Sequence, residues 1–181
     1  RFAELAVSLS QEGVKFHAVS ARNAMGLGRL DDSIEAVRRA EELSSPEFPE
    51  ELRMLKWECY TARMTDSFGN SRYPDAQADA SVVLALSPED AIALRVRGIC
   101  YFFASDHQAA IQDLGRADEI LPGNASVLFI RGLSFLEQGE LHTAGNHLGN
   151  AIDIDPSQPL YFYYRSMVNR RQAKLVDALA D

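Results

Sequence analysis

Residues 91–124 read AIALRVRGICYFFASDHQAAIQDLGRADEILPGN, and residues 125–158 read ASVLFIRGLSFLEQGELHTAGNHLGNAIDIDPSQ. The two stretches align without a gap, and Pro88, Pro122 and Pro156 follow one another at intervals of 34 residues. A constant interval of this size predicts stacked structural repeats that share one continuous core. The other residues that recur at this interval are Gly98 and Gly132, Ala110 and Ala144, Leu114 and Leu148, and Ala117 and Ala151.

Each repeat is predicted to form a helix, a tight turn and an antiparallel helix. The recurring glycine and alanines let the two helix backbones approach closely, while larger side chains fill the spaces between successive units. The proline ends the second helix because it has no N–H to donate and clashes with the preceding turn. Gly139 in one repeat and Ser105-Asp106 in the other are turn formers at the place where the two helices meet.

The order of these residues resembles the tetratricopeptide repeat. The recurring glycine matches the eighth position of that repeat, and Tyr101 or Phe135 matches its aromatic eleventh position. The two alanines match the twentieth and twenty-seventh positions, and the proline matches the thirty-second. This resemblance implies an all-α superhelical solenoid of antiparallel helix pairs, in which the first helices line a concave groove that binds another polypeptide.

The repeat pattern extends towards the N-terminus with less regular spacing. Residues 1–13 are interpreted as the end of a preceding repeat, and residues 14–47 as a repeat with Gly28 at its turn. Ala40 and Val83 occupy equivalent places but lie 43 residues apart, nine more than one period. We assign this excess to a linker at residues 48–50 and to an enlarged turn at residues 70–72, within a third helix pair that spans residues 54–90.

The repeats at residues 91–124 and 125–158 are followed by a different pattern. Residues 160–180 contain no Gly and no Pro, and Pro159 suits the first position of a helix. We therefore expect residues 159–181 to form one long C-terminal helix that covers the last repeat, because solenoids need a terminal element. The whole chain, residues 1–181, is predicted to be a single solenoid segment.

The composition of the chain argues against several classes of function. The formal net charge is −8 and the isoelectric point is near 5.0, which argues against binding to nucleic acid or to anionic membranes. No stretch approaches the roughly 18 consecutive apolar residues that a membrane span needs. Cys59 and Cys100 make no disulfide framework, which favours a reducing, cytoplasmic location. Arg1 is not an initiator methionine, so a fragment of a longer chain is expected.

Residue types that carry catalysis or bind metal do not fall into any recognisable arrangement. His142 and His147 are five residues apart, which places them on different faces of a helix, and His107 is expected in a turn. No Cys-x-x-Cys or His-x-x-x-His spacing is present. Asn124 begins an Asn-x-Ser sequon, but a helix cap explains it better. We expect no enzyme activity and no cofactor.

The positions that line the groove in this family are mainly apolar or aromatic here. Contiguous exposed apolar surface of this kind marks a protein-binding site, and a protein or peptide partner is therefore expected. The alternative is that the chain's own flanking regions cover some of these side chains. The predicted groove residues are Arg95, Ile99, Phe102, Phe103, Phe129, Ile130, Leu133, Tyr163 and Tyr164.

Residues 55–117 resemble the middle repeats of J-domain cochaperones that carry tetratricopeptide arrays, through Leu55-Lys56, residues 72–77 and residues 93–101. This resemblance implies a cochaperone-like adaptor whose partner is a chaperone or a client. The clamp that binds the acidic tails of chaperones needs Lys and Asn at defined places, where this chain has Arg95, Leu133 and Val96. A structural module that stacks on itself through the solenoid ends is the alternative function.

Overall fold

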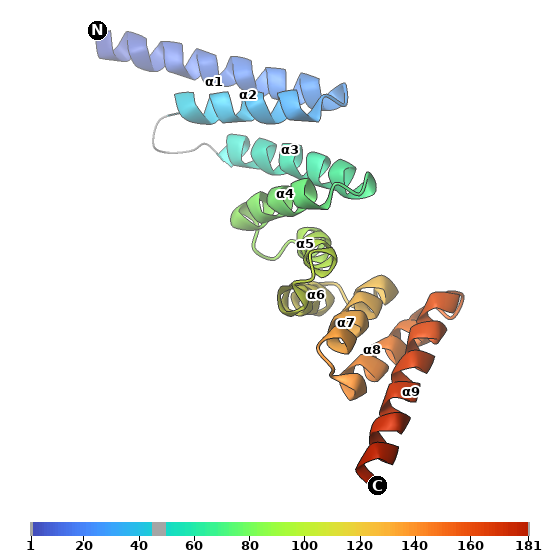
Figure 1. The fold of residues 1–181 in the computed structure, drawn as a ribbon. Coiled ribbons are helices and arrows are strands. Elements are labelled where there is room, and N and C mark those ends of the chain that lie inside the picture. The colour runs from blue at the N-terminus through green and yellow to red at the C-terminus, as the bar shows by residue number, and fades with distance from the viewer. Residues whose placement is uncertain (1, 45–49, 181) are drawn as a thin grey trace. The chain divides into compact units, whose positions relative to one another are not determined.

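The computed structural model describes the backbone of residues 2–44 and 50–180 and the side chains of residues 10–44 and 50–173. Within these residues the chain is helical and contains no strand (Figure 1). It divides into two compact units, Arg1–Pro88 and Glu89–Asp181. The helices are α1 (Phe2–Gly26), α2 (Leu30–Leu43), α3 (Glu50–Gly69) and α4 (Tyr73–Leu86) in the first unit, and α5 (Ala91–Phe103), α6 (His107–Ile120), α7 (Ala125–Glu137), α8 (Leu141–Ile154) and α9 (Pro159–Ala180) in the second.

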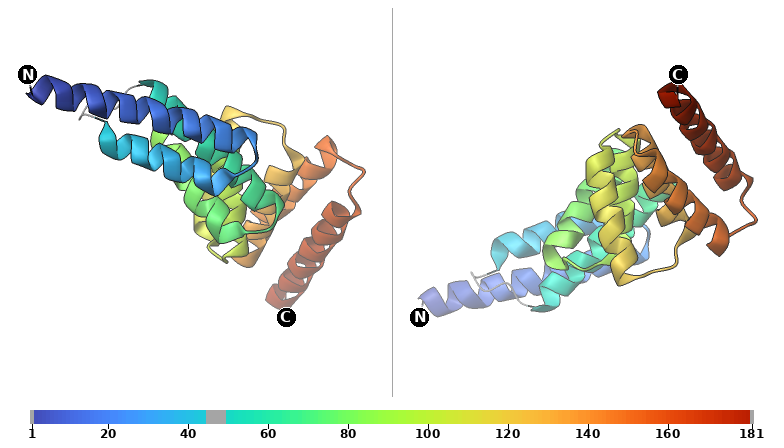
Figure 2. Two further views of the ribbon diagram at one scale, coloured as in Figure 1. Left: turned by 90° about the horizontal axis from the view of Figure 1, so that it is seen from above. Right: turned by 90° about the horizontal axis from the view of Figure 1, so that it is seen from below.

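The first eight helices form four antiparallel pairs, whose members lie side by side in both views of Figure 2. Three residues join the two helices of every pair, and the central one has a positive φ. A left-handed backbone favours glycine, and the two serines at this place adopt it at an energetic cost. The central residues are Gly28 (φ 73°), Ser71 (φ 59°), Ser105 (φ 62°) and Gly139 (φ 80°).

The enlarged turn expected at residues 70–72 is therefore wrong, because that turn has the same length as the other three. Most of the excess lies in α3, which has 20 residues against 13 in α5 and begins seven residues earlier in the repeat. The rest lies in the connection before α3, which spans residues 44–49, against residues 87–90 before α5. Residues 45–49 are outside the described part, and so is most of the predicted linker.

The N-terminal segment also differs from its prediction. Residues 2–26 form the single helix α1 rather than the end of one repeat followed by the start of the next. Gly13 lies within this helix, and a Cβ there would come within 3.0 Å of Leu43 Cδ1 in α2. The glycine thus permits close packing of α1 against the end of α2 and does not interrupt the helix.

Gly98 and Gly132 are buried where the two helices of a pair cross, as expected. A Cβ on Gly98 would lie 2.7 Å from Leu114 Cγ, and one on Gly132 would lie 2.9 Å from Leu148 Cγ. Both distances are too short for carbon atoms in contact, so only glycine fits without a shift of the partner helix. The glycine and the leucine recur at 34-residue intervals because each repeat contains this contact between its two helices.

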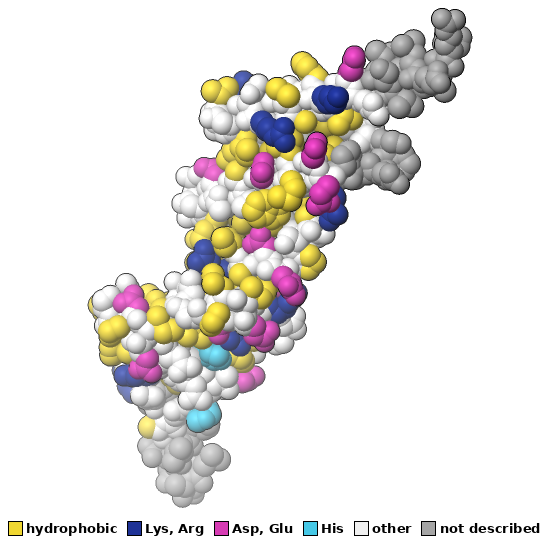
Figure 3. Space-filling view, turned by 180° about the vertical axis from the view of Figure 1, so that it is seen from behind, with side chains coloured by type: hydrophobic (Ala, Val, Ile, Leu, Met, Phe, Trp, Pro, Cys, Tyr) yellow, Lys and Arg dark blue, Asp and Glu magenta, His cyan; other side chains and the backbone are white. Residues whose placement is uncertain are grey.

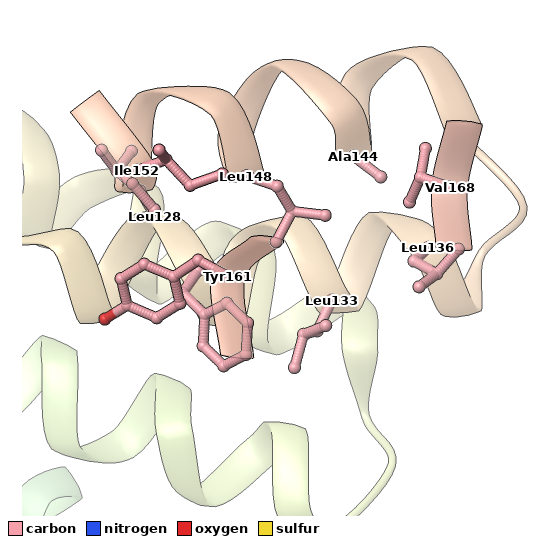
Figure 4. Packing of buried hydrophobic residues seen from close by; sticks show 10 residues of the cluster. Leu128, Leu133, Leu136, Ala144, Leu148, Ile152, Tyr161 and Val168 are labelled. Atoms are coloured by element: carbon pink, nitrogen blue, oxygen red, sulfur yellow. The ribbon is translucent and has the colours of Figure 1, made fainter. Parts of the chain in front are cut away.

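Each of the two units has an apolar cluster of its own. In the first unit the cluster contains Leu52, Leu55 and Cys59 of α3 packed on α1 and α2. In the second unit α9 covers the last helix pair, as predicted for the terminal helix. Figure 4 shows Tyr161 and Val168 of α9 beside side chains of α7 and α8. The members from α7 and α8 that the figure labels are Leu128, Leu133, Leu136, Ala144, Leu148 and Ile152.

Candidate polypeptide-binding surface

The first helices of the second unit are neighbours of one another. Helix α7 contacts both α5 and α9, whereas α6 and α8, both fully described, do not contact each other. The first helices therefore come together on one side of this unit and the second helices diverge on the other. We call the outward-facing side chains of α5, α7 and α9 the first-helix surface. All nine predicted groove residues belong to these three helices.

Two of the nine predicted residues are the most exposed. Phe103 at the end of α5 is 52% exposed, and Tyr163 near the start of α9 is 56% exposed. Two apolar residues of the same helices are similarly accessible, because Ile92 is 46% and Leu160 is 52% exposed. The remaining accessible members are partly buried: Arg95, Ile99, Phe102, Ile130 and Tyr164.

Phe129 and Leu133, by contrast, are buried in the apolar cluster of α7, α8 and α9. The Phe129 ring centroid lies 4.7 Å from that of Tyr161 and 5.6 Å from that of Tyr164, both in α9. One alternative for the groove was that flanking parts of the chain cover some of its residues. This is the case at Phe129, which α9 covers. The expectation that Phe129 is an exposed anchor is corrected: this ring is part of the core that holds α9 in place.

Each of the two exposed rings rests on a partly buried aromatic neighbour. Phe103 makes an edge contact with Phe102 at 5.6 Å between centroids, and Phe102 in turn contacts His107 at 5.6 Å. Tyr163 makes an edge contact with Tyr164 at 5.3 Å. Rings held in this way lose little conformational entropy when a partner covers them. The first-helix surface therefore offers two supported aromatic sites, one on α5 and one on α9.

Buried ion pairs join the helices of two pairs, and the sequence analysis did not anticipate them. Arg63 binds both carboxylate oxygens of Asp79 at 2.9 and 2.8 Å, and Arg97 binds those of Asp113 at 2.6 and 2.9 Å. The hydrogen bonds that the guanidinium groups donate to the aspartates raise the pKa of both arginines, so both arginines stay positively charged. The signal was present, because both pairs have the same spacing and lie 34 residues apart.

The α7–α8 pair departs from this arrangement. His147 stands where an aspartate is expected, and Arg131 instead approaches Asp118 of α6 at 3.6 Å. Burial and the charge of Arg131 lower the pKa of His147, so this imidazole is neutral near pH 7. Its ring stacks on that of Phe135, with 5.2 Å between centroids.

A cleft of about 290 Å³ lies in the first unit between the start of α3 and the end of α4. It was not foreseen, because it depends on the extra turns of α3. Trp57 and Met54 supply its apolar wall, and Met54 is 51% exposed. The other lining residues are Glu50, Arg53, Leu86 and Ser87.

The part of the chain that the structure describes was compared with the requirements of a metal site and of a membrane span. No three His, Cys, Asp or Glu side chains there come close enough to hold a metal ion. Asn124 caps α7, where its side chain accepts a hydrogen bond from the Val127 backbone amide. None of the helices, as far as they are described, combines the length and apolar character needed to cross a membrane.

Comparison with known proteins gives the class of fold. Residues 65–125 match the family model described as tetratricopeptide repeat. A search of curated protein sequences found no match. A crystal structure of MamA protein is 17% identical, with a TM-score of 0.66 over 94% of this chain and 88% of that one.

Two further solved structures support the same class. MamA 41-end from Desulfovibrio magneticus RS-1 is 15% identical, with a TM-score of 0.63 over 93% of this chain and 90% of that one. The second TPR domain of human RPAP3, in complex with an HSP70 peptide, is 15% identical, with a TM-score of 0.58 over 65% of this chain and 98% of that one. The chain therefore has the all-α fold of tetratricopeptide repeat solenoids, and residues 65–125 carry the sequence of that repeat.

Proposed function

We propose that this chain is a protein-interaction scaffold that binds a partner polypeptide on the first-helix surface. The observation that carries the proposal is the pair of exposed, supported aromatic sites at Phe103 and Tyr163. Aromatic side chains on a rigid support are the residues that most often dominate binding energy at protein interfaces. An amphipathic helix or an extended apolar segment is the type of ligand that suits such a surface.

The fold supports the same proposal. Structural neighbours of this fold include one bound to the HSP90 peptide SRMEEVD and one bound to the HSP70 peptide SGPTIEEVD. We extend the proposal to a cochaperone-like adaptor in the cytoplasm, on the basis of the resemblance of residues 55–117 and of two buried, unpaired cysteines. Because the clamp residues for chaperone tails are absent, the partner would be recognised by apolar contacts rather than by its terminal carboxylate.

The charged residues favour apolar recognition over electrostatic capture. On the face shown in Figure 3, acidic side chains are scattered among basic and apolar ones and form no continuous patch. Several acids are already paired within the chain, among them Asp79, Asp113 and Asp118. Exposed charges are screened within about 10 Å at 0.1 M salt, so scattered acidic side chains add little long-range attraction for a charged partner.

A quantitative pull-down with mass spectrometry tests the proposal. Wild-type chain, Phe103→Ala and Tyr163→Ala are compared with Ile120→Ala, a matched control because Ile120 is 43% exposed on the second helix α6. We expect one specific protein to be depleted by both aromatic substitutions and retained by the control. Proteins captured equally by all four chains would contradict the proposal.

End-to-end self-assembly is the second candidate, and exposed apolar residues on α1 favour it. Phe16 is 68% and Val19 is 55% exposed. If these side chains stack against another copy, light scattering will show an apparent mass that rises with concentration, and Phe16→Asp will abolish the rise. A mass that is constant with concentration would exclude this candidate.

A further inference from the structure

The extra turns of α3 form one wall of the cleft in the first unit. Glu50, Arg53, Met54 and Trp57 follow one another at the spacing of one helix face, and all four line the cleft. By the 34-residue interval, Trp57 matches Ala91, the first residue of α5. The other three residues of this wall therefore belong to the segment by which α3 exceeds α5.

The end of α4 supplies the rest of the lining. Leu86, its last residue, is partly buried, whereas Ile120 and Ile154 at the same place in α6 and α8 are exposed. This difference agrees with the position of Leu86 in the same cleft as Met54 and Trp57. These three side chains give the cleft an apolar interior.

The cleft has the size of a single side chain. Its volume of about 290 Å³ is just below the range of about 300–1,000 Å³ that is typical of pockets for small organic ligands. Met54 is half exposed, so the cleft opens to solvent. A long side chain presented by another polypeptide is therefore a better match than a complete small molecule.

The charges around the cleft favour a ligand with a positively charged head group. Glu50 exposes 74% of its side chain, so its carboxylate is accessible. The carbonyl end of a helix carries a partial negative charge, and the last turn of α4, a helix described in full, contains no basic residue. The face of a tryptophan ring also attracts cations, and Trp57 is part of the wall.

Arg53 also lines the cleft and carries the same charge as the expected head group. Its Nη1 atom lies 3.3 Å from Oε2 of Glu50, and both side chains are exposed. Exposed ion pairs of this kind contribute little to stability, so Arg53 can turn to solvent when another donor reaches Glu50. Arg53 is therefore a competitor of the ligand.

We propose that this cleft binds an arginine side chain of a partner polypeptide. The aliphatic stem packs on Met54 and Leu86, and the planar guanidinium stacks on Trp57. Its N–H groups donate to Glu50 and to the carbonyl end of α4. Lysine is a poorer match because its ammonium group is compact and strongly hydrated. An apolar side chain would remove water from the carboxylate and the carbonyls without donating to them.

This site lies in the first unit and does not depend on the first-helix surface. Trp57 is the only tryptophan in the sequence, so its fluorescence reports directly on the cleft. The probes are blocked tripeptides with arginine, citrulline, leucine or glutamate between two alanines. The arginine peptide should bind most tightly. Citrulline has the same shape without the charge and should bind about fivefold more weakly.

Two substitutions in the lining should have opposite effects on the arginine peptide. Glu50→Gln removes the acceptor and should weaken binding by about two- to fivefold. Arg53→Ala removes the competitor and should strengthen binding by a similar factor. The matched controls are Glu42→Gln and Arg38→Ala, which change the net charge equally at an exposed pair of α2. Neither control should change the affinity.

Several outcomes overturn the proposal. If the glutamate peptide binds more tightly than the arginine peptide, or if Arg53→Ala weakens the arginine peptide, the cleft recognises an anion. If the leucine peptide binds most tightly, the occupant is an apolar side chain. Tighter binding of agmatine, which has the guanidinium without a peptide backbone, would indicate a small molecule. Binding that appears only after Phe48→Ala would show that the chain's own linker occupies the cleft. No fluorescence response to the arginine peptide in wild type and in Arg53→Ala overturns it as well.

Discussion

The α5–α6 pair and the α7–α8 pair use the same sequence positions in different ways. At one position, Arg97 meets Asp113 in a bidentate ion pair, whereas Arg131 faces the neutral His147 and turns to Asp118 of the preceding helix. At another, Arg95 of α5 is partly exposed, whereas Phe129 of α7 is buried against α9. The contacts and burial of the side chain at each of these positions therefore depend on the neighbouring helices and not on the repeat alone.

The difference follows from where each pair lies in the second unit. Helix α9 covers the α7–α8 pair and supplies Tyr161 and Tyr164 as apolar partners. Apolar burial stabilises this pair without a second-helix carboxylate. The α5–α6 pair has the ion pair at the corresponding crossing. The α7–α8 pair is thus stabilised mainly by apolar contacts, and the α5–α6 pair also by an ion pair.

Truncation of Phe129 should have the largest effect. Phe129→Ala removes a ring packed on two tyrosines of α9 and is expected to lower the free energy of unfolding by about 3–5 kcal/mol. Arg95→Ala, at the same repeat position in α5, should change it by less than about 0.5 kcal/mol. Urea unfolding measures both. Similar losses for the two variants would show that the positions do not differ as described.

Removal of the buried carboxylate should have the next largest effect. Asp113→Ala leaves the partly buried Arg97 without its partner and is expected to cost about 2–3 kcal/mol. His147→Ala, at the equivalent position, loses mainly a ring stack and should cost about 1 kcal/mol. The comparison is again made by urea unfolding at pH 7. A larger loss for His147→Ala than for Asp113→Ala would contradict the contrast between the pairs.

Substitutions at the centres of the two turns should change the free energy of unfolding by smaller amounts and in opposite directions. Ser105→Gly relieves a left-handed serine and should raise the free energy of unfolding by about 0.5–1 kcal/mol, less than the full penalty because glycine is more flexible when unfolded. Gly139→Ser should lower it by a similar amount. Thermal unfolding detects both shifts. If Ser105→Gly is destabilising, the serine side chain contributes more than its backbone conformation costs.

The smallest expected effect is a pH dependence confined to the α7–α8 pair. The pKa of His147 in the folded chain is lowered from 6.5 by burial and by Arg131. The unfolded chain therefore binds more protons than the folded chain as the pH falls below about 6.5, and stability falls with it. His147→Gln should flatten the stability curve as the pH falls below about 6.5. An unchanged slope in this variant would assign the pH dependence to other groups.

The sequence predicted the fold well because the decisive residues act through local geometry. Gly98 and Gly132 both lie where two helices cross too closely for a Cβ atom. This shared requirement appears in the sequence as a 34-residue interval. The extra turns of α3 left no such signal, since additional helical residues look like any amphipathic sequence. Residues 70–72 were rich in turn formers and were mistaken for an insertion, although Ser71 occupies the ordinary central place of the turn.

The surface was predicted less well than the fold. All nine predicted residues lie in α5, α7 and α9, but their positions in the repeat could not show that α9 packs on Phe129. The burial of that ring depends on Tyr161 and Tyr164, which come from a helix outside the complete repeats. The ion pairs were missed because Arg97 and Asp113 are separated in sequence and carry no motif. Their recurrence at Arg63 and Asp79 was the available signal.

The central claim is that a partner polypeptide binds through exposed aromatic side chains of the first-helix surface. Its most direct test is a calorimetric titration of the partner identified by pull-down against wild type, Tyr163→Ala and Ile120→Ala, each at low and moderate salt. Truncation of an aromatic anchor typically costs about 2 kcal/mol, so Tyr163→Ala should bind roughly thirtyfold more weakly. Ile120→Ala and moderate salt should have little effect. Unchanged affinity for Tyr163→Ala, together with loss of the complex in moderate salt, would contradict the claim and assign binding to charged side chains.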